Sequence, residues 1–402
     1  MKYLLFVVLL VSFCKMNAQD AGFFSVKGKE ILDPAGKPIL LKGIGLGNWL
    51  VPEGYMFKFD KVSSPRLITD FFRILLGEVE AEKFWNRFRT DYITREDIKF
   101  IKECGFNSIR IPFNYRLFVT EAPYYELKGV GYALLDSAVK WCKEFDLPVV
   151  LDMHCAPGGQ TGDNIDDSYG YPFLFESEEN ILLTEKIWGK LADIYKNEKI
   201  IIGYDLLNEP IAHYFDKDKL NPLLEPFFKR LTSEIRKVDK NHILFIAGAQ
   251  WNSNFSVFGK PFDSKLVYTF HKYWTPPTKD VIVDYIDYGE KYNVPIWLGE
   301  SGENTNEWIN DFRIVLEKEN IGWCFWPYKK MESSRGILSI SAPEGYDSVI
   351  DFAKNFDISY GYIRDAKIDY SKMKTVFNLY LENIKLKNCT INNDYLKALG
   401  LK

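Results

Sequence analysis

The sequence has few histidines and no regular pattern of cysteines. Only four of the 402 residues are His, and none of the six Cys stands in a C-x-x-C pair. The zinc-binding sequence H-E-x-x-H is missing as well. Because metal sites and disulfide frameworks are built from such patterns, we expect neither a metal nor any other cofactor.

An excess of positive charge is also missing. The chain has 51 Lys and Arg against 55 Asp and Glu, so its formal net charge is −4. Nucleic-acid-binding proteins usually carry a basic surplus on one face, and we therefore expect no nucleic-acid partner. The 47% share of hydrophobic residues is enough for a large core and excludes a disordered chain.

Long hydrophobic runs are rare. The apolar run Tyr3–Phe13 is too short to span a bilayer, but it has the length of a signal-peptide core. We predict a signal peptide over residues 1–18, a secreted protein, and one catalytic domain over residues 19–402. The alternative is a lipid anchor on Cys14, which fits less well because a bulky residue precedes it. No later run is long enough to cross a membrane, so we expect no membrane span.

Aromatic residues, by contrast, are abundant. The chain contains ten Trp, 24 Tyr and 30 Phe, which together make up 16% of its residues. Most of these side chains must lie in the core. Several Trp, however, stand beside Gly, Pro or Asn, where strands end and pockets form. Such residues are candidates for binding a ligand.

Eight short β-forming runs recur along the chain, and several are apolar throughout, as strands buried on both faces of a parallel sheet should be. Helical patterns fill most of the gaps. This alternation predicts an α/β protein with a single (β/α)8 TIM barrel, although periodicity alone also fits a doubly wound sheet. The expected strands are Ile39–Gly45, Ser108–Phe113, Pro148–Met153, Ile200–Leu207, Ile243–Gly248, Leu266–Phe270, Pro295–Gly299 and Gly322–Trp326.

The helices between and after these strands are predicted from their amphipathic spacing. The longest connections, residues 49–79, 156–177, 211–222 and 329–370, mostly follow strand ends, so we expect them on the catalytic face of the barrel. The expected helices are Glu80–Cys104, Gly131–Phe145, Glu178–Asn197, Leu223–Val238, Ile282–Tyr292, Asn306–Glu319, Tyr346–Asn355 and Ser371–Leu386.

Two glutamates stand at matching places in this pattern. Glu209 follows the fourth expected strand and Glu300 follows the seventh. The carboxyl ends of barrel strands meet at one face, so the two carboxyl groups should converge. A pair of carboxylic acids in an aromatic cleft is what glycoside hydrolysis needs, since one protonates the leaving oxygen and the other attacks the anomeric carbon. Each Glu alone would more often be a salt-bridge or helix-capping partner.

Polar or aromatic motifs stand at the ends of the expected strands: Arg110 in IRIPF, His154 in LDMH, Asn208 and Glu209 in LLNEP, His271 and Tyr273 in FHKYW, Glu300 in WLGES and Trp326 in CFWP. This set of motifs resembles glycoside hydrolase family 5, a large family of retaining cellulases, mannanases and glucan hydrolases. The resemblance covers nearly the whole mature chain. The segments Phe84–Tyr115 and 154–164 (HCAPGGQTGDN) are closer to the exo-β-1,3-glucanase side of the family.

The resemblance implies a role for each of these positions. Glu209 would be the general acid/base, with a pKa raised by burial and by the negative charge of Glu300. Glu300 would be the nucleophile, kept ionised by Arg110. The remaining roles would be a bond from Asn208 to the sugar 2-hydroxyl, orientation of the carboxylates by His271 and Tyr273, a hydroxyl contact from His154, and a sugar platform at Trp326. Outer candidates that could select the sugar are Asn48, Trp49, Gln160, Trp251, Trp274, Glu303 and Lys329.

The sequence thus predicts a secreted, monomeric, retaining β-glycoside hydrolase that needs no cofactor and cleaves β-linked glucans or gluco-oligosaccharides. In a retaining enzyme the two carboxyl groups should lie ~5–5.5 Å apart. One alternative is a β-mannanase or another β-glycosidase of the same barrel, including one that acts on glycolipids. A second is a barrel that binds carbohydrate without cleaving it. The loop 156–177 could close one end of the cleft, which would favour exo action.

Overall fold

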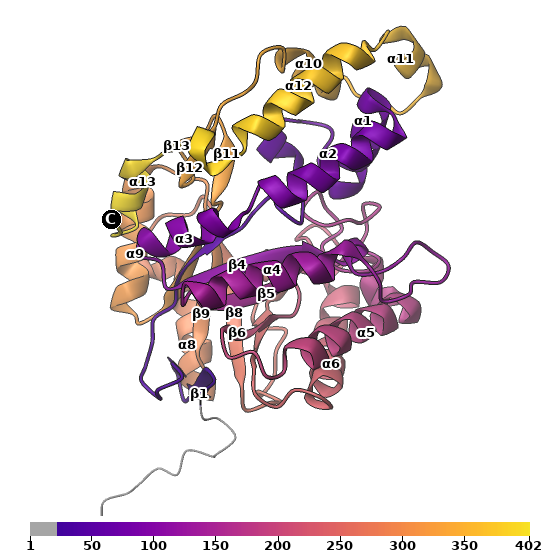
Figure 1. Ribbon diagram of the computed structural model, residues 1–402. Helices are drawn as coiled ribbons and strands as arrows, with labels where there is room; N and C mark the ends of the chain where they lie inside the picture. Colours follow the sequence, from indigo (N-terminus) through magenta and orange to yellow (C-terminus); the bar gives the residue numbers. More distant parts are fainter. Residues whose placement is uncertain (1–21) are drawn as a thin grey trace, which may run out of the picture.

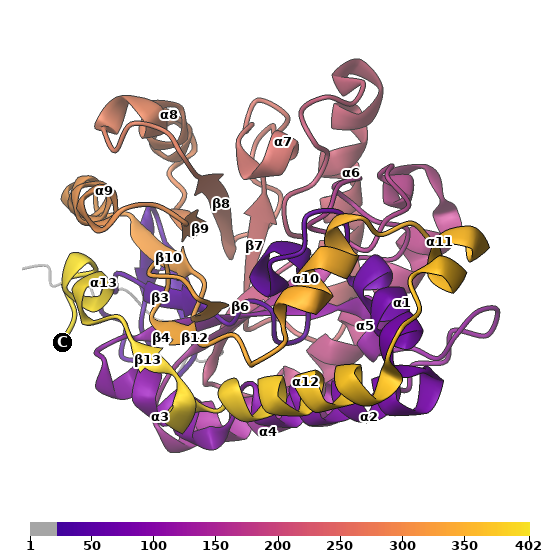
Figure 2. The same ribbon diagram turned by 90° about the horizontal axis from the view of Figure 1, so that it is seen from above.

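Eight parallel strands close into a barrel in the computed structural model, which describes residues 22–402. The predicted signal peptide and Cys14 lie outside the described residues. The barrel order is β10-β3-β4-β5-β6-β7-β8-β9, and Figure 2 shows helices around the strands. The predicted (β/α)8 barrel is confirmed. Its strands are β3 (Lys42–Gly45), β4 (Ser108–Asn114), β5 (Val149–Cys155), β6 (Ile201–Asp205), β7 (Ile243–Ala247), β8 (Leu266–Lys272), β9 (Ile296–Gly302) and β10 (Gly322–Trp326).

The other elements surround this barrel or extend its two ends. Within residues 22–402, no helix is long and apolar enough to cross a membrane. The helices are α1 (Pro65–Leu76), α2 (Glu78–Asp91), α3 (Arg95–Glu103), α4 (Val130–Glu144), α5 (Glu178–Tyr195), α6 (Lys217–Arg236), α7 (Ala249–Asn252), α8 (Val283–Tyr292), α9 (Asn306–Lys318), α10 (Asp347–Lys354), α11 (Tyr360–Asp365), α12 (Tyr370–Asn383) and α13 (Asn393–Ala398). The short 3-10 turns are Gly54–Phe57, Tyr115–Leu117, Phe173–Glu176, Lys279–Ile282 and Leu386–Asn388. The remaining strands are β1 (Ser25–Lys27), β2 (Glu30–Leu32), β11 (Lys329–Met331), β12 (Leu338–Ile340) and β13 (Thr390–Ile391).

The lower part of the barrel interior is a packed apolar core. The β1–β2 hairpin contributes Phe24 and Ile31 to it, and the strands contribute Phe245 and Trp297 among others. The strands carry such residues because both of their faces are buried. The space inside the barrel is therefore filled at the end where the strands begin, and polar side chains gather at the end where they finish.

One predicted helix is wrong. The expected helix Glu80–Cys104 is two helices, α2 and α3, which break at Thr94. The Thr94 backbone N–H donates to Asp97 Oδ2 at 2.9 Å, and the two residues form a capping box that starts a new helix.

The predicted start of α6 is also wrong. That helix begins at Lys217 rather than at Leu223, because the Asp216 side chain accepts the Lys219 N–H at 3.1 Å and caps it earlier.

The first two helices of the described chain lie against a helix near its C-terminal end. Helix α12 packs against α1 and α2, and Figure 1 shows these yellow and indigo segments side by side. A cluster of rings fills the contact, in which the rings of Phe72 and Phe377 have centroids 4.5 Å apart and planes tilted by 41°. The insertion 49–79 is thus folded onto the barrel by the C-terminal segment.

A buried ion pair connects the first turn of α3 to the start of β11. Lys329 Nζ lies 2.6 Å from Asp97 Oδ1, and both side chains are fully buried. The ammonium also donates to the backbone oxygens of Tyr92 at 2.6 Å and Ile384 at 3.0 Å. Lys329 therefore holds three separate segments together and has no remaining donor for a ligand.

This arrangement predicts the effect of Lys329→Met. The variant leaves the Asp97 carboxylate buried and unpaired, so the free energy of unfolding should fall by about 3–5 kcal/mol. Urea unfolding measures it. The KM for a glycoside should stay within about twofold of wild type in the fraction that remains folded, and a large rise in KM with unchanged stability would contradict a structural role.

Candidate active site

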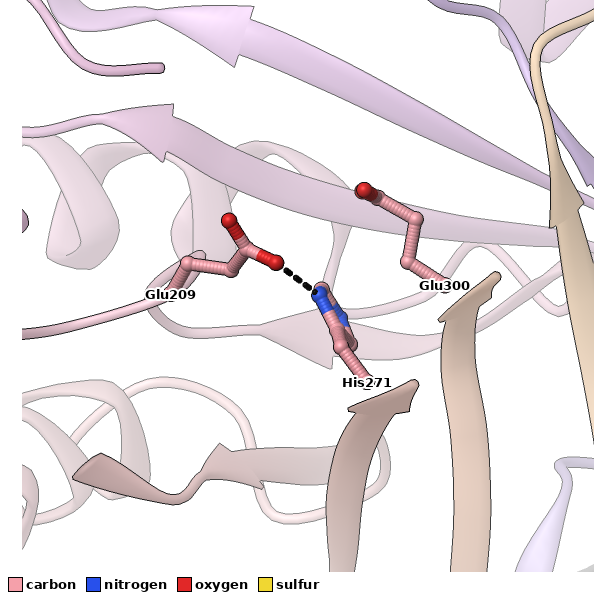
Figure 3. A group of neighbouring side chains, drawn as sticks. All are labelled: Glu209, His271 and Glu300. Atoms are coloured by element: carbon pink, nitrogen blue, oxygen red, sulfur yellow. Dashed lines mark hydrogen bonds and ion pairs between the residues drawn. The ribbon is translucent and has the colours of Figure 1, made fainter. Parts of the chain in front are cut away.

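Glu209, His271 and Glu300 converge at the carboxyl ends of the strands. Glu209 follows β6, whereas His271 and Glu300 belong to β8 and β9. Glu209 Oε1 lies 2.8 Å from His271 Nδ1, the contact that is dashed in Figure 3. One oxygen of each glutamate and one nitrogen of His271 all lie within 4.8 Å of one another. The sequence positions predicted to meet are therefore brought together.

A cavity of about 680 Å³ opens over these side chains. Both aromatic rings and hydrogen-bonding groups line it, which suits a sugar, because the ring faces of a sugar are apolar and its rim is polar. The lining residues are Glu53, Tyr55, His154, Asp163, Asn164, Ile165, Glu209, Trp251, Ser253, His271, Lys272, Tyr273, Trp274, Thr275, Glu300, Glu303 and Trp326.

Arg110 lies fully buried beneath the cavity, among acidic side chains. Its Nη1 donates to Glu300 Oε2 at 2.8 Å and its Nε donates to Asp205 Oδ2 at 2.9 Å. Its Nη2 donates to Asn208 Oδ1 at 2.8 Å and lies 3.1 Å from Asp152 Oδ1. One guanidinium thus faces three carboxyl groups, and burial raises the pKa of both aspartates to about 7 against the opposing effect of Arg110.

Glu209 is poised to carry a proton. Burial raises its pKa to about 7, while His154 and Arg110 act in the opposite direction and Asp163 adds to the rise. The negative charge that adds to the rise in the Glu209 pKa is that of Asp163, rather than that of Glu300 as expected from the sequence. Burial also lowers the pKa of His271 to about 3, so its ring is neutral and can donate from Nδ1 to Glu209 Oε1. The second oxygen of Glu209 is then left to hold the proton.

Glu300 accepts two hydrogen bonds. Tyr273 donates its hydroxyl to Glu300 Oε1 at 2.7 Å, and Arg110 binds the other oxygen. Burial raises the pKa of Tyr273 well above its usual value, which keeps the phenol a donor. Both contacts stabilise negative charge on Glu300 and fix the direction of its carboxylate.

His154 and Asn208 form a second chain of contacts beside Arg110. His154 Nδ1 lies 2.7 Å from Asp152 Oδ2, and Asn208 Nδ2 lies 3.2 Å from His154 Nε2. Burial lowers the pKa of His154 to about 4, so the ring is neutral, with its proton on Nδ1 toward Asp152. Asn208 then donates one amide hydrogen to His154. Asn208 itself is 1% exposed and is not one of the residues that line the cavity.

Trp326 forms one wall of the cavity. Its ring stacks with the His154 ring at 5.5 Å between centroids and 2° between planes, and its Nε1 donates to Tyr55 at 2.6 Å. The ring needs two glycines beneath it. A Cβ at Gly45 would lie 2.5 Å from the ring and one at Gly47 would lie 2.6 Å from it. The flat, fixed face of Trp326 is suited to stacking against a sugar.

Four of the outer candidates do not line the cavity. Lys329 pairs with Asp97, and Trp49 is 1% exposed and donates its Nε1 to the Arg89 oxygen at 2.7 Å. Gln160 is fully buried and donates to the Asn208 oxygen at 2.9 Å. Asn48 accepts the Glu53 N–H at 3.0 Å. These side chains fill the core or support loops because their polar atoms are already paired with protein groups, whereas Trp251, Trp274 and Glu303 do reach the cavity.

Glu53 and Tyr55 are wall residues that sequence reasoning missed. Glu53 is 3% exposed, and its Oε1 has no hydrogen-bond partner among residues 22–402. That oxygen lies 4.0 Å from His154 Nε2, and burial raises the pKa of Glu53 well above its usual value. Both residues lie in the insertion after β3 rather than at a strand end. The available signal was Glu53 itself, an acidic residue within the mostly apolar segment 49–57.

A barrel with two glutamates converging in an aromatic cavity is the arrangement that glycoside hydrolysis needs. A family model described as cellulase (glycosyl hydrolase family 5) matches residues 76–332. The chain belongs to that family, and the predicted family is confirmed.

Curated relatives of this chain carry different names within glycoside hydrolysis. A β-xylosidase of Phanerodontia chrysosporium is 26% identical over 365 residues, 81% of this chain and 74% of that protein. Endoglucanase C of Acetivibrio thermocellus is 27% identical over 303 residues, which cover 60% of this chain and 85% of that one. A glucan 1,3-β-glucosidase of Lachancea kluyveri is 32% identical over 235 residues, about half of each chain at 54% and 53%.

Solved structures share the fold. The crystal structure of AoRut has a TM-score of 0.61 and 17% identity, covering 73% of this chain and 89% of that one. An endogalactoceramidase has a TM-score of 0.58 and 18% identity over 77% of this chain and 75% of that one. Thermotoga maritima Cel5A with cellobiose has a TM-score of 0.54 and 20% identity over 90% and 97%.

The contacts of Arg110 predict how two replacements should differ. Arg110→Lys keeps the charge but loses the planar fork that reaches Glu300, Asp205 and Asn208, so kcat should fall by about a hundredfold or more. Arg110→Met leaves three carboxyl groups without a counter-charge, and its free energy of unfolding should fall by a further ~3 kcal/mol. Steady-state kinetics and urea unfolding measure both. A wild-type kcat in Arg110→Lys would show that the fork is not needed.

Proposed function

We propose that this glycoside hydrolase retains the configuration at the anomeric carbon, with Glu300 as the nucleophile and Glu209 as the general acid/base. The observation that carries the proposal is the separation of at most 4.8 Å between one oxygen of each glutamate. Inverting enzymes keep their two carboxyl groups ~6.5–9.5 Å apart to leave room for water. The short separation leaves no room for that water molecule, so one glutamate must attack the anomeric carbon directly.

The contacts assign the steps. A Glu300 oxygen attacks the anomeric carbon while the Glu209 proton passes to the departing glycosidic oxygen, which gives a glycosyl ester on Glu300. Glu209, now ionised, takes a proton from water, and that water attacks the anomeric carbon and frees Glu300. The remaining amide hydrogen of Asn208 would bind the sugar 2-hydroxyl, a contact that strengthens in the transition state. Trp326 supports the sugar from below.

The proposed substrate is a β-linked glucan or gluco-oligosaccharide. Support comes from the relatives named endoglucanase and glucan 1,3-β-glucosidase and from the stacking surfaces of the cavity.

We also propose that the protein is a monomer and that it is secreted. Secretion is proposed because the apolar run before residue 19 has signal-peptide length. Sequencing of the protein from culture medium should find Gln19 first, and a chain that keeps residues 1–18 would contradict secretion by this route.

Hydrolysis of a glycan panel tests the substrate and the nucleophile together. The panel holds β-1,3-, β-1,4- and β-1,6-glucans, xylan, mannan, and aryl β-glycosides. Wild type should cleave one glucan linkage best, and Glu300→Gln should lose several powers of ten in kcat because the nucleophile is gone. Glu307→Gln, an exposed glutamate in the first turn of α9, is the matched control and should keep wild-type activity.

Two results would contradict this assignment. An active Glu300→Gln variant would remove Glu300 as the nucleophile. Preferred cleavage of mannan or xylan would replace the glucan substrate, and no cleavage at all with measurable glycan binding would favour a barrel that only binds carbohydrate. Sizing the products separates exo from endo action, since exo cleavage releases a single small sugar.

The pKa of Glu209 predicts the alkaline side of the pH profile. Its folded value is raised to about 7 by burial, so Glu209 is protonated and active as an acid below pH 7 and loses its proton above it. The ratio kcat/KM should therefore fall above pH 7, with an apparent midpoint near that value. Glu209→Gln should lack this fall on phenyl β-glucoside, whose leaving group needs the proton, although its kcat/KM on that substrate should be far lower than that of wild type. An unchanged alkaline fall in that variant would assign the titration to another group.

A further inference from the structure

Glu209 has an unusual backbone conformation. Its φ is +44°, in the left-handed region that residues with a Cβ rarely adopt. It also precedes Pro210, and a residue before proline is restricted further. A chain left to itself would therefore seldom place Glu209 this way, so neighbouring groups must hold it.

Two buried side chains bind the peptide groups on either side of Glu209. Asn252 Oδ1 accepts the Glu209 N–H at 3.0 Å, and Thr161 Oγ1 donates to the Glu209 backbone oxygen at 2.7 Å. Both side chains are 0% exposed. They come from different segments, Asn252 from the short helix α7 after β7 and Thr161 from the loop after β5. Because the backbone N–H can only donate, this contact also fixes which way the Asn252 amide faces.

Thr161 is itself held firmly. The buried Asp166 carboxylate accepts the N–H groups of Thr161 at 2.7 Å, Gly162 at 2.9 Å and Ser168 at 2.9 Å. The backbone of the same loop pairs with the segment after Glu209, since the Ala212 N–H donates to the Thr161 oxygen at 3.0 Å. These contacts fix the loop, and the Thr161 hydroxyl is therefore held in place against the Glu209 backbone oxygen.

We propose that Thr161 and Asn252 are positioning residues for the general acid, acting through the backbone of Glu209. The proposal rests on the function proposed above, in which Glu209 protonates the leaving group. The Glu209 side chain makes one described contact of its own, from Oε1 to His271 Nδ1. Rotation of its backbone would break that contact and turn the second oxygen away from the glycosidic bond.

Leaving-group dependence distinguishes this role from a purely structural one. A 2,4-dinitrophenolate departs without a proton, whereas a phenolate or sugar alkoxide needs one from Glu209. Misplacing the acid should therefore slow hydrolysis of phenyl β-glucoside and spare that of 2,4-dinitrophenyl β-glucoside. A general loss of folding or binding would slow both alike. The ratio kcat/KM is the quantity to compare, because it reports the step in which the leaving group departs.

Thr161→Val is the first variant, since it removes the hydroxyl at nearly constant volume. Its kcat/KM for phenyl β-glucoside should fall by about tenfold to a hundredfold, while that for the dinitrophenyl substrate stays within about threefold. Thr161→Ser should restore both values. Thr184→Val is the matched control, because Thr184 is also fully buried but donates to the Asn180 oxygen within α5 at 2.8 Å. It should leave the ratio of the two substrates unchanged.

Equal loss on both substrates, or no loss on either, would overturn the proposal. If Thr161→Val does not fold, as judged by circular dichroism and thermal melting, Asn252→Ala decides the question by the same ratio. Glu209→Ala in the same panel separates the two hypotheses. If it lacks the leaving-group signature, the proposed role of Glu209 fails. If it shows the signature and the Thr161 and Asn252 variants do not, only the positioning role fails.

Discussion

The active site depends on one buried cation. Arg110 lies at the centre of the barrel with no exposed surface, and its guanidinium contacts Asp152, Asp205 and Glu300. A buried ion pair is stable only when its geometry satisfies most donors and acceptors, and here the fork uses all three of its nitrogens. The same guanidinium also fixes the side chains of Glu300 and Asn208. The positive charge that neutralises the buried carboxyl groups therefore also orients the groups of the active site.

The loops around this centre hold strained conformations in place. Glu209, Trp251, Trp274 and Glu303 all have positive φ and all line the cavity. Each such residue costs of order 1–3 kcal/mol and persists only where its surroundings fix it. Side chains that support the loops without lining the cavity, such as Gln160, supply those contacts. The precision of the site therefore comes from the insertions as much as from the strands.

The strand-end pattern was enough to predict both the barrel and the convergence of Glu209 and Glu300, because an apolar run that turns polar is a local signal in the sequence. Other features have no such signal. The break at Thr94 depends on a capping box inside an otherwise continuous amphipathic pattern, and Glu53 lies in an insertion whose path is set by long-range packing. Lys329 stands at a strand end as a ligand-binding residue would, yet its partner Asp97 is distant in sequence. Burial of a polar pair depends on contacts that one segment alone does not reveal.

The measurement that tests the mechanism most directly is capture of its intermediate. A 2-deoxy-2-fluoro-β-glucosyl fluoride slows both chemical steps but keeps a good leaving group, so a glycosyl enzyme should accumulate. Mass spectrometry of the intact protein and its peptides then finds the label. We predict one sugar per chain, attached to Glu300. A label on Glu209, or an enzyme that hydrolyses its substrate with inversion and never carries a label, would contradict it.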